Sequence, residues 1–221
     1  MTSDSVNEQE LWDDTLFMTV LFLANMGRIE GKPRYTQEAE YQFLLHAKYL
    51  ADRKTGLWYH GWTFNGRHNF SGAFWGRGNC WITVAIPEFL AMTDCAPAVR
   101  HALAELLRAQ VDRLIRFQDP GGMWYILIDD KDSYVEPSES CGFAFGILRG
   151  VHTGLLDEGC EAAAVKALGA ILDHICGDGV VRQVSYGTPM GRENRDFYKS
   201  IPIQPMPYGQ ALAMLLLIEL Q

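Results

Sequence analysis

Residues 11–24 read LWDDTLFMTVLFLA, and this stretch places two adjacent carboxylates at the start of an almost entirely apolar segment. A helix turns by about 100° per residue, so Asp13 and Asp14 cannot share one of its faces. One carboxylate can reach water, whereas the other turns toward the side that packs against the protein. A buried carboxylate without a partner is costly, so it is expected to be paired or protonated. The run from Thr15 to Ala24 is apolar on every side, which predicts an inner helix covered all round.

Apolar periodicity of the helical kind dominates the rest of the chain. It predicts helices over residues 8–26, 37–52, 76–93, 97–117, 139–154, 159–176 and 207–220. The helix over 97–117 is amphipathic, which is typical of an outer helix with one wet face.

A short repeat lies between these helices. GLWYHGW begins at Gly56, GMWYILI at Gly122 and GVVRQVS at Gly179, at spacings of 66 and 57 residues. Each follows a helix and precedes a long loop and another apolar helix. Such a period predicts stacked or ring-arranged helix pairs with their long loops on one face. An α/α toroid fits better than a four-helix bundle, because the loops of bundles are short.

Composition limits the class of protein. The 221 residues are 48% hydrophobic and 21% charged, which predicts one globular domain over residues 1–221. A net charge of −8 argues against nucleic acid or an anionic membrane as the main partner. Five cysteines without CxxC spacing indicate reduced thiols rather than disulfides or a zinc site. The beginning of the chain lacks the features of a signal peptide and the apolar run is too short for a membrane span, so we expect a soluble, cytoplasmic protein.

The densest chemical signal is GLWYHGWTFNGRHNFSGAFWGRGNCW at residues 56–81, an aromatic loop that also carries arginine and histidine. Aromatic faces beside such groups suit a sugar ring that bears a carboxylate. Alternatively, Trp58 and Trp62 close the top of a helical ring. His60, between Tyr59 and Gly61, favours a substrate contact over a buried structural role, and no metal-ligand spacing is present.

Arg77 stands between Gly76 and Gly78 just before a predicted helix. The glycines would let the backbone approach a ligand and leave the guanidinium free, with helix N-terminal amides adding to anion binding. The alternative is a salt bridge from Arg77 to an acid of an outer helix.

Two later segments leave alternatives open. The stretch YGTPMGRENRDFYKS carries Arg192, Arg195, Tyr198 and Lys199, whose side chains could wall a pocket. For the two arginines, a position in a solvated charge run is favoured instead. In SYVEPSES, a serine at 138 or 140 is expected to cap a helix, and Glu136 and Glu139 are expected to do little beyond capping.

Taken in order, LWDDTLFMTVLFLA, GLWYHGW, FWGRGNCW, SYVEPSES and the late DFY and PMPYGQALAML resemble the unsaturated rhamnogalacturonyl hydrolases. These form glycoside hydrolase family 105 and are relatives of the unsaturated glucuronyl hydrolases. The resemblance implies an all-α (α/α)6 barrel, here incomplete with about seven helices. It also implies an acidic substrate, an unsaturated uronic-acid oligosaccharide from pectin degradation.

The implied reaction hydrates the C4=C5 double bond and does not use the two-carboxylate displacement of ordinary glycosidases. It needs no metal or organic cofactor. Carried over by position, Asp14 is the general acid/base, buried so that it can hold a proton, and Asp13 fills a neighbouring position without that role. The sugar would be held by Trp12, His60, Trp75, Arg77 and Trp81.

The chain departs from the family pattern in one respect: family members carry further helices and a second active-site aspartate before the tryptophan–aspartate motif. The expectation is therefore an N-terminally truncated relative whose open barrel edges, near residues 8–26 and 207–220, expose apolar faces. Such faces drive association, which predicts a homo-oligomer. The alternative function is a catalytically impaired relative that serves as a carbohydrate-binding or assembly module.

Overall fold

Helices dominate the computed structural model, which describes residues 7–221. Seven α-helices occur in this part of the chain, as predicted: α1 (Leu21–Glu30), α2 (Pro33–Leu50), α3 (Gly76–Met92), α4 (Pro97–Phe117), α5 (Pro137–His152), α6 (Glu161–Leu172) and α7 (Pro207–Glu219). Strand β1 (Glu10–Trp12) and a π-helical turn η2 (Leu16–Val20) precede α1, and strand β2 (Gly61–Thr63) and the 3-10 turns η3 (Glu158–Cys160) and η4 (Arg195–Ser200) lie between later helices.

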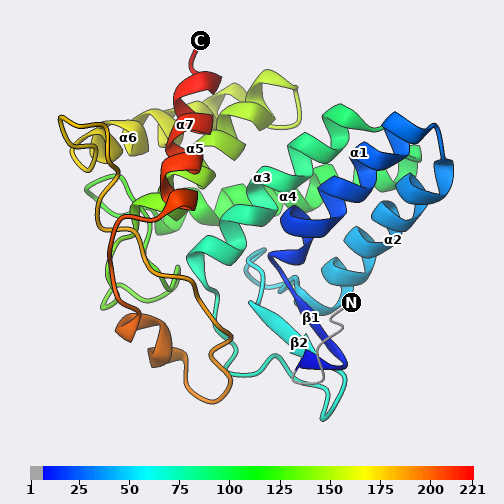
Figure 1. Cartoon of the computed structure of the whole chain (residues 1–221), viewed down its shortest axis with the longest axis horizontal. Coiled ribbons are helices and arrows are strands. Elements are labelled where there is room, and N and C mark those ends of the chain that lie inside the picture. The colour runs from blue at the N-terminus through cyan, green and yellow to red at the C-terminus, as the bar shows by residue number, and fades with distance from the viewer. Residues whose placement is uncertain (1–6) are drawn as a thin grey trace.

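The helices form two layers that alternate along the chain (Figure 1). The inner helices pack in order, α1 on α3, α3 on α5 and α5 on α7, while α2, α4 and α6 back the first three of them. Helices α3 and α5 are buried on nearly every side, whereas α4 buries one stripe only. This alternation of inner and outer helices is the hairpin arrangement that the sequence predicts.

Proline marks the start of four helices. Pro33, Pro97, Pro137 and Pro207 occupy the first helical position of α2, α4, α5 and α7. A proline at that position loses no hydrogen bond, because the first N–H groups of a helix have no partner within it. The sequence therefore held a boundary signal that the apolar periodicity did not use.

The helix predicted over residues 8–26 is wrong at its beginning. Residues 10–12 form a strand, antiparallel to β2, with Glu10 opposite Thr63 and Trp12 opposite Gly61. The helical conformation starts only after the acidic pair, first as η2 and then as α1. The pairing with β2 joins segments about fifty residues apart, and local periodicity does not reveal such a contact.

The three repeated segments share one backbone feature. Each begins at a glycine with positive φ: 78° at Gly56, 112° at Gly122 and 81° at Gly179. Side chains avoid this conformation, so glycine lets the chain turn sharply out of each outer helix. The segments that follow lie on the same side of the molecule as β1 and β2 (Figure 1). The predicted placement of the long loops on one face is confirmed.

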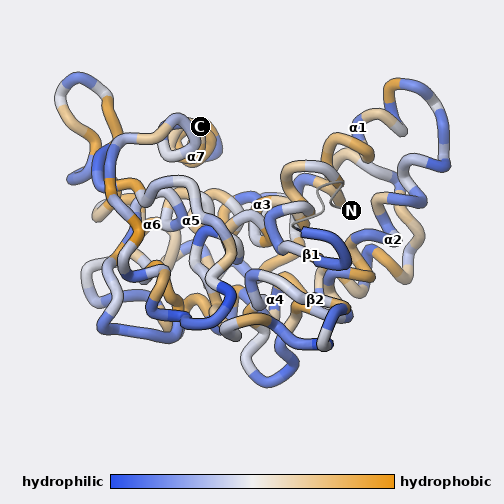
Figure 2. The backbone as a smooth tube through the Cα atoms, turned by 60° about the horizontal axis from the view of Figure 1, so that its bottom comes forward, coloured by the Kyte–Doolittle hydropathy of each residue, from blue (hydrophilic) through white to orange (hydrophobic). Residues whose placement is uncertain are grey.

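Helices α1 and α7 form the two ends of the inner arc (Figure 2). Both leave large apolar side chains in water, among them Phe22 at 63% and Ile218 at 61% exposure. Met18 and Ile29 are similarly exposed at one end, and Met214 at the other. Within residues 7–221, no helix combines the length and the hydropathy that crossing a membrane requires.

Candidate active site

Strand β1 leads directly into the acidic pair. The N–H of Asp13 donates to the carbonyl of His60 at 3.0 Å, which extends the contact between β1 and β2 by one residue. Immediately afterwards the N–H groups of Phe17 and Met18 donate to the carbonyl of Asp14 at 3.1 and 3.0 Å. π-helical turns such as η2 are rare and concentrate at functional sites. Two carboxylates thus sit where a strand ends and an irregular helix begins.

Asp14 lies half-buried at this junction. Burial raises the pKa of its carboxyl above the ordinary value, while the nearby Arg77 guanidinium and the backbone amides of Asp14 and Thr15 oppose that shift. The net direction is upward. A carboxyl that retains its proton to higher pH and still has exposed surface meets the two requirements of a general acid/base.

Asp13 is buried more deeply than Asp14. It has no exposed surface, and among the described residues neither of its carboxyl oxygens has a hydrogen-bond partner. Burial raises its pKa well above the usual range, and the charge of Asp14 raises it further. The adjacent acids therefore do face different environments, as expected, although they lie in a turn before η2 and not on a helix. The deeply buried one, however, is Asp13, whereas the expected acid/base keeps access to solvent.

The glycines beside Arg77 admit carboxyl groups rather than a ligand. A Cβ added at Gly78 would overlap the carboxyl of Asp13, and one added at Gly76 would overlap the carboxyl of Glu139. The first turn of α3 is therefore enclosed by an acid on each side. This corrects the expectation that both glycines serve close approach of the backbone to a substrate.

Glu139 is the residue of this cluster that the sequence did not reveal. It comes from α5, has no exposed surface, and neither carboxyl oxygen has a hydrogen-bond partner among the described residues. Burial and the neighbouring Glu136 raise its pKa well above the usual range, while Arg77 opposes the shift. A glutamate within a helix that is otherwise buried all round was the available signal.

Glu136, in contrast, is the cap of α5. Its carboxylate accepts hydrogen bonds from the N–H of Glu139 at 2.8 Å, the hydroxyl of Ser138 at 2.7 Å and the N–H of Ser185 at 2.8 Å. A capping role for Glu136 is confirmed, but the expected serine cap at 138 or 140 is not. Glu136 also fastens the segment around residue 185 to the site.

His60 is fully buried between aromatic rings. Its ring centre lies 4.3 Å from that of Trp75 and 5.6 Å from that of Trp12, and its Nδ1 meets the hydroxyl of Tyr198. Burial, and then Arg77, lower the pKa of His60 to about 3, so the ring is neutral. The Tyr198 oxygen already accepts from the N–H of Gly191 at 3.1 Å and can donate its hydrogen to Nδ1. That tautomer leaves Nε2 as an N–H donor, and Nε2 has no partner among residues 7–221.

The three predicted tryptophans occupy different positions. Trp12 is half-buried and donates its indole N–H to Glu10 at 2.8 Å. Trp75 is 2% exposed and contacts His60. Trp81 lies in the second turn of α3, where it stacks on Phe17 at 4.4 Å within the main core. The structure therefore brings Trp12 and Trp75 into contact with His60 and places Trp81 apart from them, against Phe17.

Arg77 has neither of the two environments considered from sequence. It is 3% exposed, and its guanidinium donates to the carbonyl and hydroxyl of Ser185, to the carbonyl of Tyr186 at 3.1 Å and to Thr188 at 2.7 Å. It also lies over the rings of Trp75 and Tyr208, at 4.9 and 4.6 Å. Arg77 thus anchors the segment 185–188 against the start of α3 while its charge acts on Asp14.

The loop of residues 186–204 is more structured than a solvated charge run. Tyr198 is buried against His60, as the pocket-wall interpretation requires. Arg192 pairs with Glu10 at 2.7 Å, and Arg195 pairs with Asp129. Their side chains stay 41% and 36% exposed, so the favoured interpretation of both arginines as solvated side chains holds, with an ion pair added to each.

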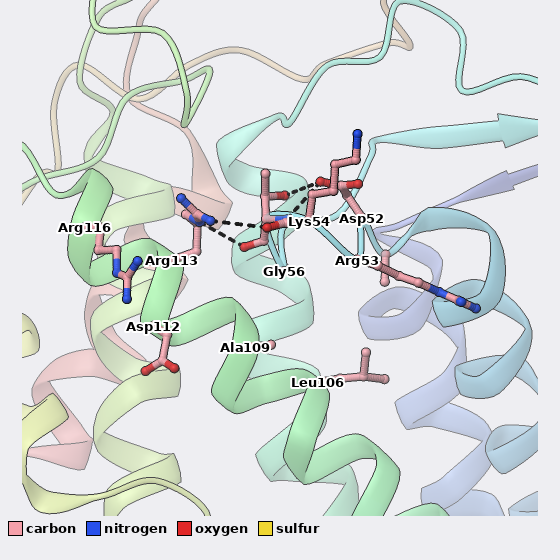
Figure 3. A pocket seen from close by; sticks show the side chains of 11 residues that line it. Asp52, Arg53, Lys54, Gly56, Leu106, Ala109, Asp112, Arg113 and Arg116 are labelled. Carbon is pink, nitrogen blue, oxygen red and sulfur yellow. Dashed lines mark hydrogen bonds between the residues drawn. The ribbon is translucent and has the colours of Figure 1, made fainter.

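A cavity of about 280 Å³ between residues 51–56 and α4 contains none of the predicted site residues (Figure 3). Arg113 is held there by the carbonyls of Thr55 and Lys54 at 3.1 and 3.3 Å. Figure 3 shows Arg53 and Arg116 at opposite ends of this cavity, so the cations do not converge on a common ligand. Within residues 7–221, no three acidic, histidine or cysteine side chains are grouped closely enough to hold a metal ion.

The chain is similar in sequence to known glycoside hydrolases. The family described as Glycosyl Hydrolase Family 88 matches residues 1–221. The unsaturated rhamnogalacturonyl hydrolase YesR of Bacillus subtilis is 33% identical over 98% of this chain and 61% of its own length. An unsaturated 3S-rhamnoglycuronyl hydrolase of an Alteromonas species is 29% identical over 79% of this chain and 44% of its own.

Solved structures agree. A possible member of the GH105 family from Salmonella enterica superposes with a TM-score of 0.96 at 48% identity, covering 99% of this chain and 58% of that one. A family 105 glycoside hydrolase from C. acetobutylicum gives a TM-score of 0.87 at 26% identity, over 97% of this chain and 66% of that one. The chain thus spans about three fifths of the length of YesR and of the Salmonella protein.

Proposed function

The chain belongs to glycosyl hydrolase family 88, and from that membership we propose that it acts on unsaturated uronic-acid oligosaccharides derived from pectin. The reaction is hydration of the C4=C5 double bond of the terminal uronate. One similar enzyme named above is called an unsaturated rhamnogalacturonyl hydrolase and the other an unsaturated 3S-rhamnoglycuronyl hydrolase, which supports an unsaturated sugar as substrate.

In the proposed mechanism Asp14 performs both proton transfers. The protonated carboxyl gives its proton to C4, and the resulting carboxylate takes a proton from the water molecule that attacks C5. The hemiketal formed at C5 then opens, which releases the saturated sugar and a 5-keto uronate. A carboxyl with a raised pKa and partial exposure suits both steps, because it starts protonated and can meet the substrate.

The surrounding groups have distinct proposed roles. The half-buried ring of Trp12 offers a face for the sugar, and Trp75 supports His60. His60 is proposed as a neutral Nε2–H donor to a substrate oxygen or to the attacking water, and since Nε2 is buried, this contact requires the surrounding aromatic rings to move aside. Arg77 holds segment 185–188 in place and limits how far the pKa of Asp14 rises. Trp81 keeps η2 in register through its stacking on Phe17.

The observation that carries the proposal is the position of Asp14, which is only partly buried and lies within reach of the charge of the buried Arg77. The test is the ultraviolet absorbance of an unsaturated uronide, which hydration of the double bond removes. Wild-type protein should remove it, and Asp14→Asn should be slower by about a thousandfold, the middle of the range for general acid/base groups. Asp157→Asn, in a loop on the outer side, is the matched control and should keep wild-type activity. Retention of more than a tenth of the rate by Asp14→Asn would contradict the assignment.

A second candidate function is carbohydrate binding or assembly without turnover. It is favoured by the fraction of the relatives that this chain matches, because residues outside that fraction can contribute to catalysis in those proteins. Saturable binding of the unsaturated disaccharide in calorimetry, combined with unchanged absorbance, would support this second function and exclude the first.

We also propose that the chain forms a homo-oligomer through α1 and α7, since both ends of the inner arc expose large apolar side chains. Light scattering should give a mass above that of one chain, and Phe22→Glu combined with Ile218→Glu should reduce it to one chain. A wild-type monomer would refute the proposal. A cytoplasmic location is proposed from the five free cysteines, and cell fractionation tests it.

A further inference from the structure

Residues 187–201 form a loop whose two ends are fastened together. The N–H of Tyr186 donates to the carbonyl of Pro202 at 2.8 Å, and the N–H of Gln204 donates to the carbonyl of Val184 at 2.8 Å. The loop between these anchors contains the turn η4 and lies on the side of the molecule that carries β1 and β2 (Figure 1). A loop of this length with joined ends is an Ω-loop, a compact surface element that frequently has a functional role.

The inner side of the 187–201 loop covers His60. Tyr198 has no exposed surface, and its hydroxyl meets Nδ1 of His60. The thioether methyl of Met190 lies so close to Gly61 that a Cβ added there would overlap it. Because His60 itself is only 2% exposed, a substrate atom can reach its ring only after part of this cover has moved.

Among the groups that cover His60, those of the loop have the weakest attachment. Trp12 is held in the ladder between β1 and β2, and Trp75 is held at the start of α3. Tyr198 and Ile201 of the loop pack in a small apolar cluster that is separate from the main core. Segments with few buried apolar contacts open locally at a lower free energy than the whole domain unfolds. The loop is therefore the part of the cover that can move.

Ion pairs hold the outer side of the loop. Three cations of the loop each pair with an acid outside it: Arg192 with Glu10, Arg195 with Asp129 and Lys199 with Asp130. The side chains of these cations are 41%, 36% and 30% exposed. Exposed ion pairs contribute little to stability and are screened by salt. They therefore hold the loop closed only weakly, and less at high ionic strength.

Polar groups without a protein partner gather beside the inner side of the loop. Nε2 of His60, the indole N–H of Trp75 and both carboxyl oxygens of Asp13 are buried and have no hydrogen-bond partner within residues 7–221. The rings of His60 and Trp75 lie 4.3 Å apart, and the N–H of Asp13 donates to the carbonyl of His60. Buried polar groups cost free energy unless they are hydrogen-bonded. A ligand that supplies these hydrogen bonds therefore favours the closed loop.

Tyr198 also decides where the hydrogen of the His60 ring is located. Burial raises the pKa of the Tyr198 hydroxyl, the N–H of Gly191 opposes that shift, and Asp13 adds to it. The hydroxyl therefore keeps its hydrogen. Since it accepts from Gly191 and donates to Nδ1, the ring hydrogen of His60 is held on Nε2. Opening of the loop removes this constraint.

We infer that the 187–201 loop is a lid that opens to admit substrate to His60, and that Tyr198, on closing, fixes the ring hydrogen of His60 on Nε2. Tyr198 is thus a positioning residue, which acts on the substrate through His60. Closure of the lid completes the arrangement of groups around the substrate. The inference rests on the proposed function, because it treats His60 as a group that contacts the substrate.

Hydrogen–deuterium exchange measured by mass spectrometry tests the lid without any ligand. Arg195→Gln combined with Lys199→Gln should make the amides of residues 187–201 exchange about fivefold faster, the factor expected for two exposed ion pairs. Raising the salt concentration from about 0.05 to about 0.5 M should accelerate this exchange in the wild-type protein and less in the double variant. Lys32→Gln combined with Arg108→Gln removes two exposed ion pairs elsewhere and should leave it unchanged. Equal exchange in the loop variant and the wild type at both salt concentrations would overturn the lid.

Nitrogen NMR of the His60 ring tests the role of Tyr198. The wild-type spectrum should show the hydrogen on Nε2. Tyr198→Phe keeps the ring that packs in the cover but removes the hydroxyl, so both tautomers should become populated. Tyr186→Phe, in a half-exposed ring at the base of the lid, is the matched control and should leave the tautomer unchanged. A hydrogen on Nδ1 in the wild type, or an unchanged tautomer in Tyr198→Phe, would overturn the positioning role.

Unsaturated digalacturonate tests whether a ligand closes the lid. At about ten times its dissociation constant it should slow the exchange of the lid amides about tenfold, because it binds the closed form. Bound disaccharide that leaves this exchange unchanged would overturn closure by the ligand. Failure of the disaccharide to bind at all would contradict the proposed function, whereas the exchange and NMR experiments need no ligand and still decide on the lid and on Tyr198.

Discussion

Two pairs of acidic residues approach the first turn of α3 from opposite sides. The pairs differ in the hydrogen bonds and the exposure of their carboxyl groups. Directly after β1 come Asp13, buried without a partner, and Asp14, partly buried near Arg77. From α5 come Glu139, buried without a partner, and Glu136, buried with three hydrogen bonds. Each pair thus places one buried, unpartnered carboxyl with a raised pKa against a glycine of α3. The second member differs: Glu136 is fixed as a cap, whereas Asp14 stays free to exchange a proton.

If Asp14 is the catalytic acid, as we propose, burial alone does not identify it. Asp13 and Glu139 have the more strongly perturbed pKa values, but no exposed surface through which a substrate could reach them. Asp14 has the smaller burial and a charged neighbour, which is the combination that general acid/base catalysis uses.

The largest effect on stability should come from adding a side chain at Gly76 or Gly78. Gly76→Ala and Gly78→Ala should each lower the free energy of unfolding by about 3 kcal/mol, the upper part of the range for overpacking. The reason is that the enclosed carboxyls of Glu139 and Asp13 cannot move away. Denaturant unfolding measures this. Gly169→Ala in α6, which meets no neighbour, is the control and should be neutral or slightly stabilising. Adding Glu139→Ala to Gly76→Ala should restore part of the loss, and no restoration would contradict the steric account.

Removing Glu136, the acid with three hydrogen bonds, should lower the free energy of unfolding by somewhat less than the glycine substitutions do. Glu136→Ala should lower the free energy of unfolding by about 2 kcal/mol, because it leaves the N–H groups of Glu139 and Ser185 buried without acceptors. Thermal unfolding at pH 7 measures this. Glu158→Ala, at the exposed turn η3, should have no measurable effect. Equal stability of the two variants would show that the cap contributes nothing.

Replacing Asp13 or Glu139, the acids without hydrogen-bond partners, by a neutral isostere should increase the free energy of unfolding instead of lowering it. A carboxyl whose pKa is raised on folding takes up protons as the chain folds, so its contribution is fully present below the unfolded pKa of about 4 and is lost as the pH rises through the folded value. Asp13→Asn and Glu139→Gln should therefore each raise the free energy of unfolding at pH 7 by roughly 1 kcal/mol. They should also flatten its decline above pH 4. A loss of stability in both variants at pH 7 would contradict the assignment of protonated carboxyls.

The smallest expected effect is a change in the pKa of Asp14 when Arg77 is replaced. Arg77→Gln removes the positive charge that opposes the shift, so the pKa of Asp14 should rise further. Arg77→Lys keeps the charge and should change this pKa less, although both variants lose hydrogen bonds to segment 185–188. Carbon-detected NMR titration of the Asp14 carboxyl measures it without any need for turnover. An identical pKa in both variants would show that the charge of Arg77 does not reach Asp14.

Sequence alone determined the elements that depend on local patterns. Alternating inner and outer helices follow from apolar periodicity, and the sharp turns at Gly56, Gly122 and Gly179 follow from a short repeat. The grouping of Trp12, His60, Trp75 and Arg77 was also predictable, because motif order carried it.

Tertiary structure decided the rest. The strand at residues 10–12 depends on pairing with β2, and the partners of Arg77 lie more than one hundred residues away along the chain. Which of the two adjacent aspartates is sealed, and that Glu139 joins them, follow from how α5 and β1 pack against α3. The physical reason is that burial and electrostatics at a site are sums over neighbours distant in sequence, whereas a sequence pattern reports only what each segment prefers by itself.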